Sequence, residues 1–258
     1  MTTYIRFTTT ADSAIRSGVL DGDTVREYEG TPFDRPTLNG RTHSVADIVL
    51  QAPFQPTHII GIGKNFAGEG EIKPDVPDLP ILFFKPQTSV IGPNEPIVVP
   101  EGVSEVKFES ELAVVIGKRC RDIRPEDAAS HIFGCTIAND VAALDLFHPE
   151  GHWTVGKAFD TFCPLGPVLV TSFDYGSARI RARVNGTEKQ NSAMERIIMP
   201  IDRMIAYIST FMTLSPGDVI LTGTPAGADL VRAGDVVECL IDGIGSLTNP
   251  VRAARSAQ

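Results

Sequence analysis

Two glutamates separated by one residue open the stretch Lys107–Gly117, KFESELAVVIG. This stretch is typical of a β-strand, because it is apolar and β-branched toward its end and is closed by a glycine. Strand side chains alternate between faces, so Glu109 and Glu111 share a face with Ala113 and Val115. Two like charges this close repel unless a cation lies between them, and Mg²⁺ and Ca²⁺ prefer carboxylate oxygens. The same pattern also fits an exposed edge strand with solvated glutamates.

A third carboxylate, Asp140, ends another apolar run, CTIAND. Three carboxylates at the ends of buried strands need a cation or protons, since burying isolated charges is costly. Salt bridges to Lys or Arg are the structural alternative. Two further polar residues stand beside apolar strands. Lys157 lies between Gly156 and an apolar run, and Thr224 precedes Pro225. Their ordinary interpretations are a surface lysine and a turn residue.

Many short apolar runs punctuated by Gly and Pro predict a mostly β (α+β) fold, a sandwich, roll or barrel. Residues 1–55 are predicted to form a small N-terminal domain and residues 56–258 the catalytic domain. In the first we expect strands over Tyr4–Thr9, Ala14–Leu20 and Thr24–Tyr28, and a short helix over Val45–Leu50, capped by Ser44.

In the second unit, helices are expected from Arg124 to Gly134 and over Pro200–Met212, where apolar residues recur at helical spacing. Asn185-Gly186 predicts the turn of a hairpin. Residues 64–80 are rich in Gly, Pro and charge, which indicates a long surface loop that acts as a lid or binding loop.

The net charge of −9 over 258 residues, without a run of like charges, argues against nucleic-acid and anionic-membrane partners. No segment approaches the length of a transmembrane helix, and the N-terminus lacks an apolar signal core, so we expect a cytoplasmic protein. The four cysteines are widely spaced and are expected to be reduced, packed thiols.

Seven motifs occur in one order along residues 58–251: GIGKNF, LFFKP, FESELAVVIGK, GCTIANDV, GKAFDTFCPLGP, VNG and LSPGDVILTGTPAG. Together they resemble the fumarylacetoacetate hydrolase family, which includes acylpyruvases and 2-hydroxyhepta-2,4-diene-1,7-dioate isomerases. The resemblance implies a mixed β-sandwich roll, a homodimer, and 2-oxo or 2,4-dioxo acid substrates. It also implies an Mg²⁺ or Mn²⁺ site formed by Glu109, Glu111 and Asp140. By the same resemblance Lys157 reaches into the active site and Thr224 holds the substrate carboxylate. Further substrate-binding positions are Phe66, Lys85, Leu144 and Phe147.

The chain departs from the family pattern in its lid. Hydrolytic members carry a lid motif that resembles N-Y-x-x-H-x-x-E, whose His and Glu activate water. Here Glu69 and Ile72 occupy those two positions. Glu69 or Glu71 can serve as the base if burial raises its pKa, or both are solvated loop residues. His148 or His152 is a further candidate replacement for the lid histidine.

A second departure follows Asp140, where Leu144 and Phe147 stand in place of the family's arginine and glutamine. Apolar groups there argue against a second substrate carboxylate at that position. The first functional hypothesis is a metal-dependent hydrolase that cleaves a C–C bond of a 2-oxo or 2,4-dioxo acid. A decarboxylase or keto–enol isomerase using the same site is the alternative, because neither needs an attacking hydroxide. A catalytically silent ligand-binding relative is a third reading.

Overall fold

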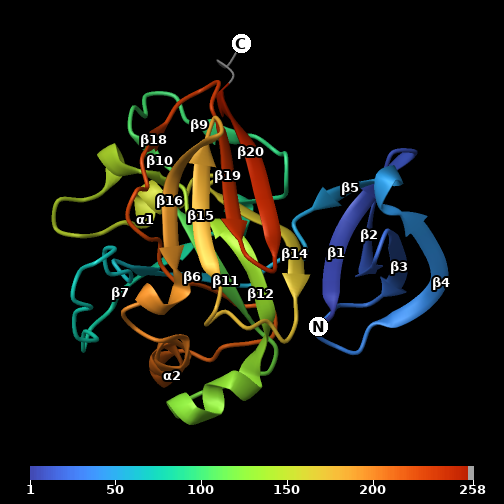
Figure 1. Ribbon diagram of the computed structural model, residues 1–258, viewed down its shortest axis with the longest axis horizontal. Helices are drawn as coiled ribbons and strands as arrows, with labels where there is room; N and C mark the ends of the chain where they lie inside the picture. The colour runs from blue at the N-terminus through green and yellow to red at the C-terminus, as the bar shows by residue number, and fades with distance from the viewer. Residues whose placement is uncertain (255–258) are drawn as a thin grey trace.

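The computed structural model describes residues 1–254 and confirms a mostly β fold with small helical additions (Figure 1). One long path of paired strands runs through the molecule in the order β4-β3-β2-β1-β14-β12-β11-β17-β6-β7. Among these residues, no helix is long and apolar enough to cross a membrane.

The N-terminal strands form the lobe seen at the right of Figure 1. They are β1 (Thr3–Thr9), β2 (Asp12–Asp21), β3 (Thr24–Glu29), β4 (Thr37–Ser44) and β5 (Ile48–Gln51). The predicted first three strands are present, but the helix expected over Val45–Leu50 is wrong. Only a 3₁₀ turn over Val45–Asp47 forms, and β5 follows because its backbone pairs with β1.

The lobe joins the rest of the chain through β1, whose Thr3 and Tyr4 pair with Val170 and Leu169 of β14. The central strands of the path are β6 (Ile59–Gly63), β7 (Ile81–Lys85), β11 (Ser110–Ile116), β12 (Ile132–Asn139), β14 (Cys163–Val170) and β17 (Val219–Leu221). Short β8 (Val90–Ile91) pairs with β14.

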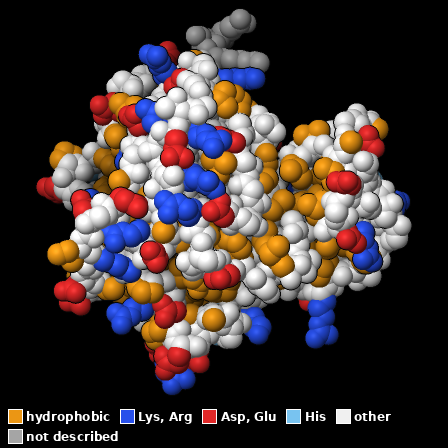
Figure 2. Space-filling model, in the orientation of Figure 1, with side chains coloured by type: hydrophobic (Ala, Val, Ile, Leu, Met, Phe, Trp, Pro, Cys, Tyr) orange, Lys and Arg blue, Asp and Glu red, His pale blue; other side chains and the backbone are white. Residues whose placement is uncertain are grey.

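A second, five-stranded sheet packs over this path in the order β16-β15-β19-β20-β9. Its strands are β9 (Ile97–Val99), β15 (Arg179–Val184), β16 (Thr187–Ala193), β19 (Val236–Ile241) and β20 (Gly245–Ala253). The hairpin turn predicted at Asn185-Gly186 is confirmed, with φ values of 50° and 79° at these two residues. Lys, Arg, Asp and Glu side chains intermingle over β15, β16 and β19 (Figure 2), where Arg183 pairs with Glu238 and Lys189 with Asp229.

The main core lies between the two sheets, and every residue of β11 is buried. Leu112, Val114 and Ile116 join the main core, whereas Ala113 and Val115 join a smaller cluster on the other face. The alternation predicted for this stretch therefore holds. Since both faces are covered, the strand is central, and the exposed-edge alternative is wrong.

Helices are few and short among the described residues. α2 (Ile201–Phe211) confirms the predicted helix over Pro200–Met212. The helix expected from Arg124 to Gly134 is a 3₁₀-helix over Pro125–His131, and Gly134 lies within β12 instead. A side chain at Gly134 would approach the Val170 carbonyl oxygen of β14 at 2.3 Å, so this glycine serves strand packing rather than helix termination. The remaining elements are α1 (Thr154–Lys157), β10 (Val106–Lys107), β13 (Ala142–Ala143) and β18 (Leu230–Val231).

Candidate active site

Strand direction gathers the polar residues at one end of the long sheet. β11 runs antiparallel to β12 and β17, so its start lies beside the ends of both neighbours. Ser110 pairs with Asn139, and Ala113 with Leu221. Because β6 is parallel to β17, the loop that follows β6 leaves from the same end. Residues far apart in the sequence therefore converge around Glu109.

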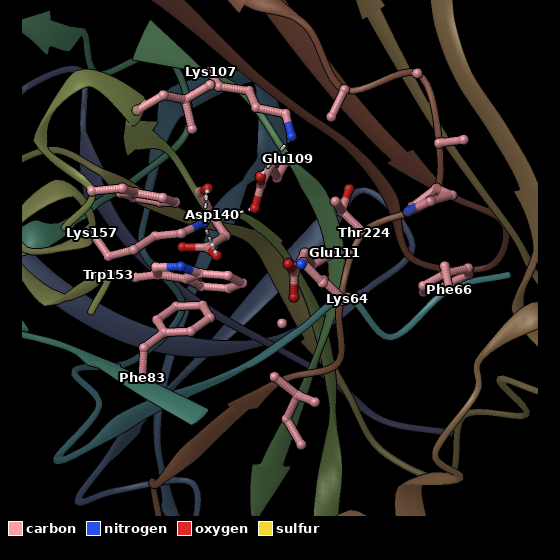
Figure 3. A pocket seen from close by; sticks show the side chains of 18 of the residues that line it. Lys64, Phe66, Phe83, Lys107, Glu109, Glu111, Asp140, Trp153, Lys157 and Thr224 are labelled. Carbon is pink, nitrogen blue, oxygen red and sulfur yellow. Dashed lines mark hydrogen bonds and ion pairs between the residues drawn. The ribbon is translucent and has the colours of Figure 1, made fainter. Parts of the chain in front are cut away.

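The three predicted carboxylates are brought together (Figure 3): one oxygen from each of Glu109, Glu111 and Asp140 lies within 4.8 Å of the others. Glu109 precedes β11 rather than lying within it, because its backbone N–H donates to Asn139 Oδ1 (2.9 Å) instead of a strand partner. Asp140 N donates to the Glu109 carbonyl oxygen (2.8 Å). These bonds fix the backbone on which two of the carboxylates stand.

Lys157 reaches this cluster from the end of α1. Its Nζ donates to Glu109 Oε2 (2.7 Å), Asp140 Oδ2 (2.5 Å) and the Asp140 carbonyl oxygen (3.2 Å), which occupies all three ammonium protons. Burial favours the neutral amine, but the charges of Asp140 and Glu109 outweigh it and raise the pKa of Lys157. The surface-lysine alternative is wrong. At neutral pH this side chain is a buried cation and not a base.

Lys85 holds Asp140 from behind. Its Nζ lies 2.7 Å from Asp140 Oδ1 and donates to the Val141 carbonyl oxygen (2.9 Å). Burial acts to raise the pKa of Asp140, but Lys157 and Lys85 outweigh it and lower that pKa. Lys85 is buried and does not line the cavity, so the geometry gives the predicted substrate contact no support. The strand places it beneath the carboxylate, where it fixes Asp140.

Glu111 is the member of the cluster that no lysine or arginine contacts within 4 Å among the described residues. Its Oε2 accepts the Gly223 N–H at 2.7 Å. Burial, followed by the charges of Asp140 and Glu109, raises the pKa of Glu111 well above its ordinary value of 4.5. A divalent cation between the three carboxylates would replace the proton that Glu111 otherwise holds. The donor set of three carboxylate oxygens therefore fits a hard cation.

Lys107 completes the surroundings of Glu109, with its Nζ 3.1 Å from Glu109 Oε1. The sequence interpretation missed this lysine, although its position two residues before Glu109 places both side chains on one face of an extended segment. Glu109 thus has a lysine at each oxygen, Lys107 at Oε1 and Lys157 at Oε2.

The carboxylates open into a cavity of about 620 Å³. Most of the predicted site residues line it, namely Phe66, Glu71, Glu109, Glu111, Asp140, Leu144, Phe147, Lys157 and Thr224. Sequence interpretation missed other lining residues, among them Ile62, Lys64, Phe83 and Trp153. Gly61 and Gly63 in the GIGKNF motif were an available signal, since a glycine in a strand marks a close approach by another group.

The loop after β6 carries one acidic side chain to the cavity. Glu71 lines it, and its Oε2 accepts the Gly68 N–H at 3.1 Å. Glu69 is exposed and outside the cavity, and Ile72 is 96% exposed. The role of Glu69 as a base stays a prediction without support from the geometry, because Glu71 and not Glu69 lines the cavity. His148 and His152 are also exposed and border a separate surface hollow beyond Phe147, so neither replaces the lid histidine.

Thr224 lies beside the carboxylates, but its hydroxyl is already used. It donates to the Ser110 carbonyl oxygen (2.8 Å) and accepts from Gln190 Nε2 (2.8 Å). Its single proton is not free for a substrate carboxylate in this arrangement. The neighbouring backbone offers other donors. Within residues 1–254, the N–H groups of Ala226, Gly227 and Ala228 have no hydrogen-bond acceptor, and these residues line the cavity.

The four cysteines lie apart from this chemistry. All are buried and unpaired in disulfides among the described residues. Burial raises the pKa of Cys135, Cys163 and Cys239 to about 12, so their thiols stay protonated and unreactive at neutral pH.

Comparisons with known proteins place this site in a family context. Residues 58–252 match the family model described as "Fumarylacetoacetate (FAA) hydrolase C-terminal", and residues 3–53 match "Rv2993c-like, N-terminal". The mitochondrial oxaloacetate tautomerase fahd2 of Xenopus laevis is 46% identical over 233 residues, which cover 84% of this chain and 73% of that protein.

Two solved structures have the same fold as this chain. The 2-hydroxyhepta-2,4-diene-1,7-dioate isomerase of Mycobacterium marinum superposes with a TM-score of 0.90 at 39% identity, over 98% of this chain and 99% of that one. The maleylpyruvate hydrolase of Sphingobium sp. SYK-6, solved with manganese(II) and pyruvate, gives a TM-score of 0.81 at 28% identity, over 98% and 100% of the two chains.

Proposed function

Since this chain belongs to the fumarylacetoacetate hydrolase family, we propose that it is a divalent-metal-dependent tautomerase that interconverts the keto and enol forms of a 2-oxo acid. The observation that carries this proposal is the composition of the cavity. Among the described residues, the metal-ligand carboxylates and Lys157 are all in place, while Glu71 is the only other acidic side chain that lines it. Tautomerisation needs one proton relay, whereas hydrolysis needs water that is both oriented and deprotonated.

Glu109, Glu111 and Asp140 would hold Mg²⁺ or Mn²⁺. When bound, the cation would act as a Lewis acid toward the oxygens of the substrate. The free N–H groups of Ala226–Ala228 suit the substrate's carboxylate, since backbone donors bind anions well.

The chain's own residues supply the rest of the chemistry. Lys157 Nζ donates its three protons to Glu109 and Asp140, so it fixes these two carboxylates, and its positive charge lowers the electrostatic cost of an enolate formed beside them. Glu71 takes the proton from C3 at Oε1, the oxygen that the Gly68 N–H leaves free, and delivers it to the 2-oxygen of the enolate to give the enol; the reverse reaction moves the same proton from the 2-oxygen back to C3.

The test is a set of enol–keto assays on oxaloacetate with Mg²⁺ or Mn²⁺, followed by ultraviolet absorbance, with chelator-treated protein and metal alone as controls. We expect acceleration only with both metal and protein. Glu71→Gln should slow the reaction about 100-fold, in the range of general acid–base effects. Glu69→Gln, two residues away and outside the cavity, should leave it unchanged. No acceleration by the metal-loaded wild type would contradict the proposal.

Cleavage of a C–C bond is the second candidate, favoured by the likeness to a maleylpyruvate hydrolase. Product analysis separates the reactions. An acylpyruvate that yields pyruvate and an acid indicates hydrolysis, and CO₂ from oxaloacetate above the metal-only rate indicates decarboxylation. If none of these substrates reacts, a catalytically inactive, ligand-binding role would be favoured.

A further inference from the structure

The cavity contains an aromatic wall that the proposed chemistry does not use. We give this name to Phe83, Phe147 and Trp153, which lie beside the carboxylate cluster (Figure 3 labels Phe83 and Trp153 next to Lys157). Phe147 and Trp153 are stacked, with ring centroids 5.4 Å apart and planes 10° from parallel. The ring centroids of Phe83 and Trp153 are 5.8 Å apart. Lys157 Nζ lies 4.9 Å from the Phe83 ring centroid, so the wall begins at the catalytic lysine.

Each ring of the wall lies against a glycine. A Cβ added at Gly61 would come within 2.0 Å of Phe83, at Gly63 within 2.2 Å of Trp153, and at Gly156 within 2.5 Å of Phe147. Real side chains do not tolerate such contacts, so the backbone is built to receive these rings. Gly61 also pairs directly with Phe83 across β6 and β7. The three rings therefore have fixed positions before any ligand arrives, which lowers the entropic cost of binding.

The cavity is larger and less polar than a small dicarboxylic acid requires. Its volume of about 620 Å³ lies within the range of about 300–1,000 Å³ that holds drug-sized ligands. Around the wall the lining is apolar, with Ile62 and Leu144 beside the rings and no arginine among the lining residues. Three lysines line the cavity. Lys157 and Lys107 contact Glu109, and Lys64 is exposed and forms no ion pair among the described residues.

We propose that the substrate is a 2-oxo acid with a planar aryl group at C3, and that this aryl group stacks on the aromatic wall. The proposal rests on the tautomerase function proposed above. A planar π-system matches the stacked faces of Phe147 and Trp153, and conjugation with such a group stabilises the enol. A carboxylate placed against the three rings would instead meet apolar surface and lose hydration there.

Trp153 makes the wall directly observable, because it is the only tryptophan of the chain. We would titrate the Mg²⁺-loaded protein with phenyllactate and with lactate, which share the carboxylate and 2-oxygen, differ in the phenyl group, and cannot enolise. Calorimetry gives the affinities, and the fluorescence of Trp153 reports contact with the wall. We expect phenyllactate to bind at least about 10-fold more tightly and to change the fluorescence, with lactate doing neither.

Matched variants make the test specific. Phe147→Gln should abolish most of the preference for phenyllactate and leave lactate affinity unchanged. Phe84→Ala, next to the wall residue Phe83 but 43% exposed and outside the cavity, should preserve the preference. In turnover assays, the enol–keto conversion of phenylpyruvate should exceed that of oxaloacetate in kcat/KM by about 10-fold or more.

The outcomes separate this inference from the proposed function. Equal affinities for phenyllactate and lactate, with no fluorescence change, would overturn the aromatic-wall proposal even if oxaloacetate is tautomerised. A clear phenyllactate preference that Phe147→Gln removes would support the aromatic-wall proposal even if no 2-oxo acid is turned over. The absence of turnover would overturn only the proposed tautomerase function.

Discussion

At the scale of single residues, Glu111 is the side chain that favours interpreting the carboxylate cluster as a metal site rather than as a set of salt bridges. Lysines satisfy Glu109 and Asp140, but Glu111 has only the Gly223 N–H as a partner among the described residues. Removing a partner of a metal ligand already lowers metal affinity by about 10- to 100-fold, so removing a ligand should cost at least about 100-fold.

We therefore expect the double variant Glu109→Ala, Glu111→Ala to lose Mg²⁺ and Mn²⁺ binding by at least this factor in calorimetric titrations. The matched control is Glu105→Ala, an exposed glutamate outside the cluster. Unaltered metal affinity in the double variant would disprove the assignment of the centre.

The raised pKa of Glu111 also makes the stability of the metal-free protein depend on pH. The native carboxyl holds a proton that the unfolded chain releases above its ordinary pKa of 4.5. The stabilisation from that proton is complete below pH 4.5 and is lost as the pH rises through the raised native pKa. We expect the melting temperature of chelator-treated protein to fall over this window, and Glu111→Gln, which stays neutral, to flatten the fall. In the control Glu105→Gln, the melting temperature should fall with pH as steeply as in the wild type. An equally steep fall in Glu111→Gln would contradict this explanation.

Lys85 is expected to act through Asp140 rather than on the substrate. Removing one member of a buried ion pair typically costs about 3–5 kcal/mol, because the other charge is left uncompensated. Lys85→Met should therefore lower the free energy of unfolding by about this amount in chemical denaturation, and weaken metal binding about 10- to 100-fold. Lys118→Met, an exposed lysine, is the control. A variant that lost substrate affinity at unchanged metal affinity would instead restore the predicted substrate contact.

At the scale of elements, the loop over residues 64–80 is fastened to the segment before α2. Phe66 forms a β-bridge with Ile197, and Ala67 N donates to the Arg196 carbonyl oxygen at 3.0 Å. Arg196 Nη2 in turn donates to the carbonyl oxygens of Gly68 (2.5 Å) and Glu71 (2.8 Å). Arg196 thus positions the part of the loop that brings Phe66 and Glu71 to the cavity.

Hydrogen bonds from charged groups contribute about 1.5–3 kcal/mol each, so Arg196→Ala should lower kcat/KM by about 10- to 100-fold. Hydrogen exchange of residues 66–71 should rise at the same time, which a change confined to α2 would not cause. Lys73→Ala removes only an exposed 3.4 Å contact with the Glu195 carbonyl oxygen and should have little effect. Unchanged exchange in Arg196→Ala would show that the bridge alone holds the loop.

At the scale of the whole molecule, the N-terminal lobe covers part of the catalytic sheet. Phe54, together with Phe33 from the loop before β4, belongs to the cluster formed with Ala113, Leu165 and Val219 of the central strands. The two phenylalanine rings meet edge to face at 5.6 Å. The lobe therefore contributes to the stability of the sheet that carries the metal ligands.

We expect Phe54→Ala to lower the free energy of unfolding by about 3–5 kcal/mol, the usual cost of emptying a buried phenylalanine site. Val49→Ala, at a position 45% exposed in β5, should change it little. Denaturant titration of both variants tests this, and equal stabilities would mean that the lobe and the sheet fold independently.

The homodimer remains a prediction from the family resemblance, and sedimentation of the full chain would test it.

The sequence by itself determined the family, the strand-rich class and the three residues of the carboxylate cluster. Those features depend on local order: two glutamates at alternate strand positions, an aspartate after an apolar run, and motifs in a fixed succession. The hairpin at Asn185-Gly186 was predictable for the same reason, since those two residues adopt the positive φ values of its turn. The misplaced helix over Val45–Leu50 shows the limit, because pairing with β1 overrides local preference there.

Only the tertiary structure decided what each polar side chain touches. Lys85 and Lys157 are both lysines beside apolar strands, yet the first lies behind Asp140 and the second reaches the cavity. Glu69 and Glu71 are two residues apart and both exposed, yet only Glu71 lines the cavity. The aromatic wall unites residues from β7 and from the segment between β12 and α1 against three glycines, a contact that no local pattern encodes. Strand pairing sets these distances, because it joins segments that are remote in the chain.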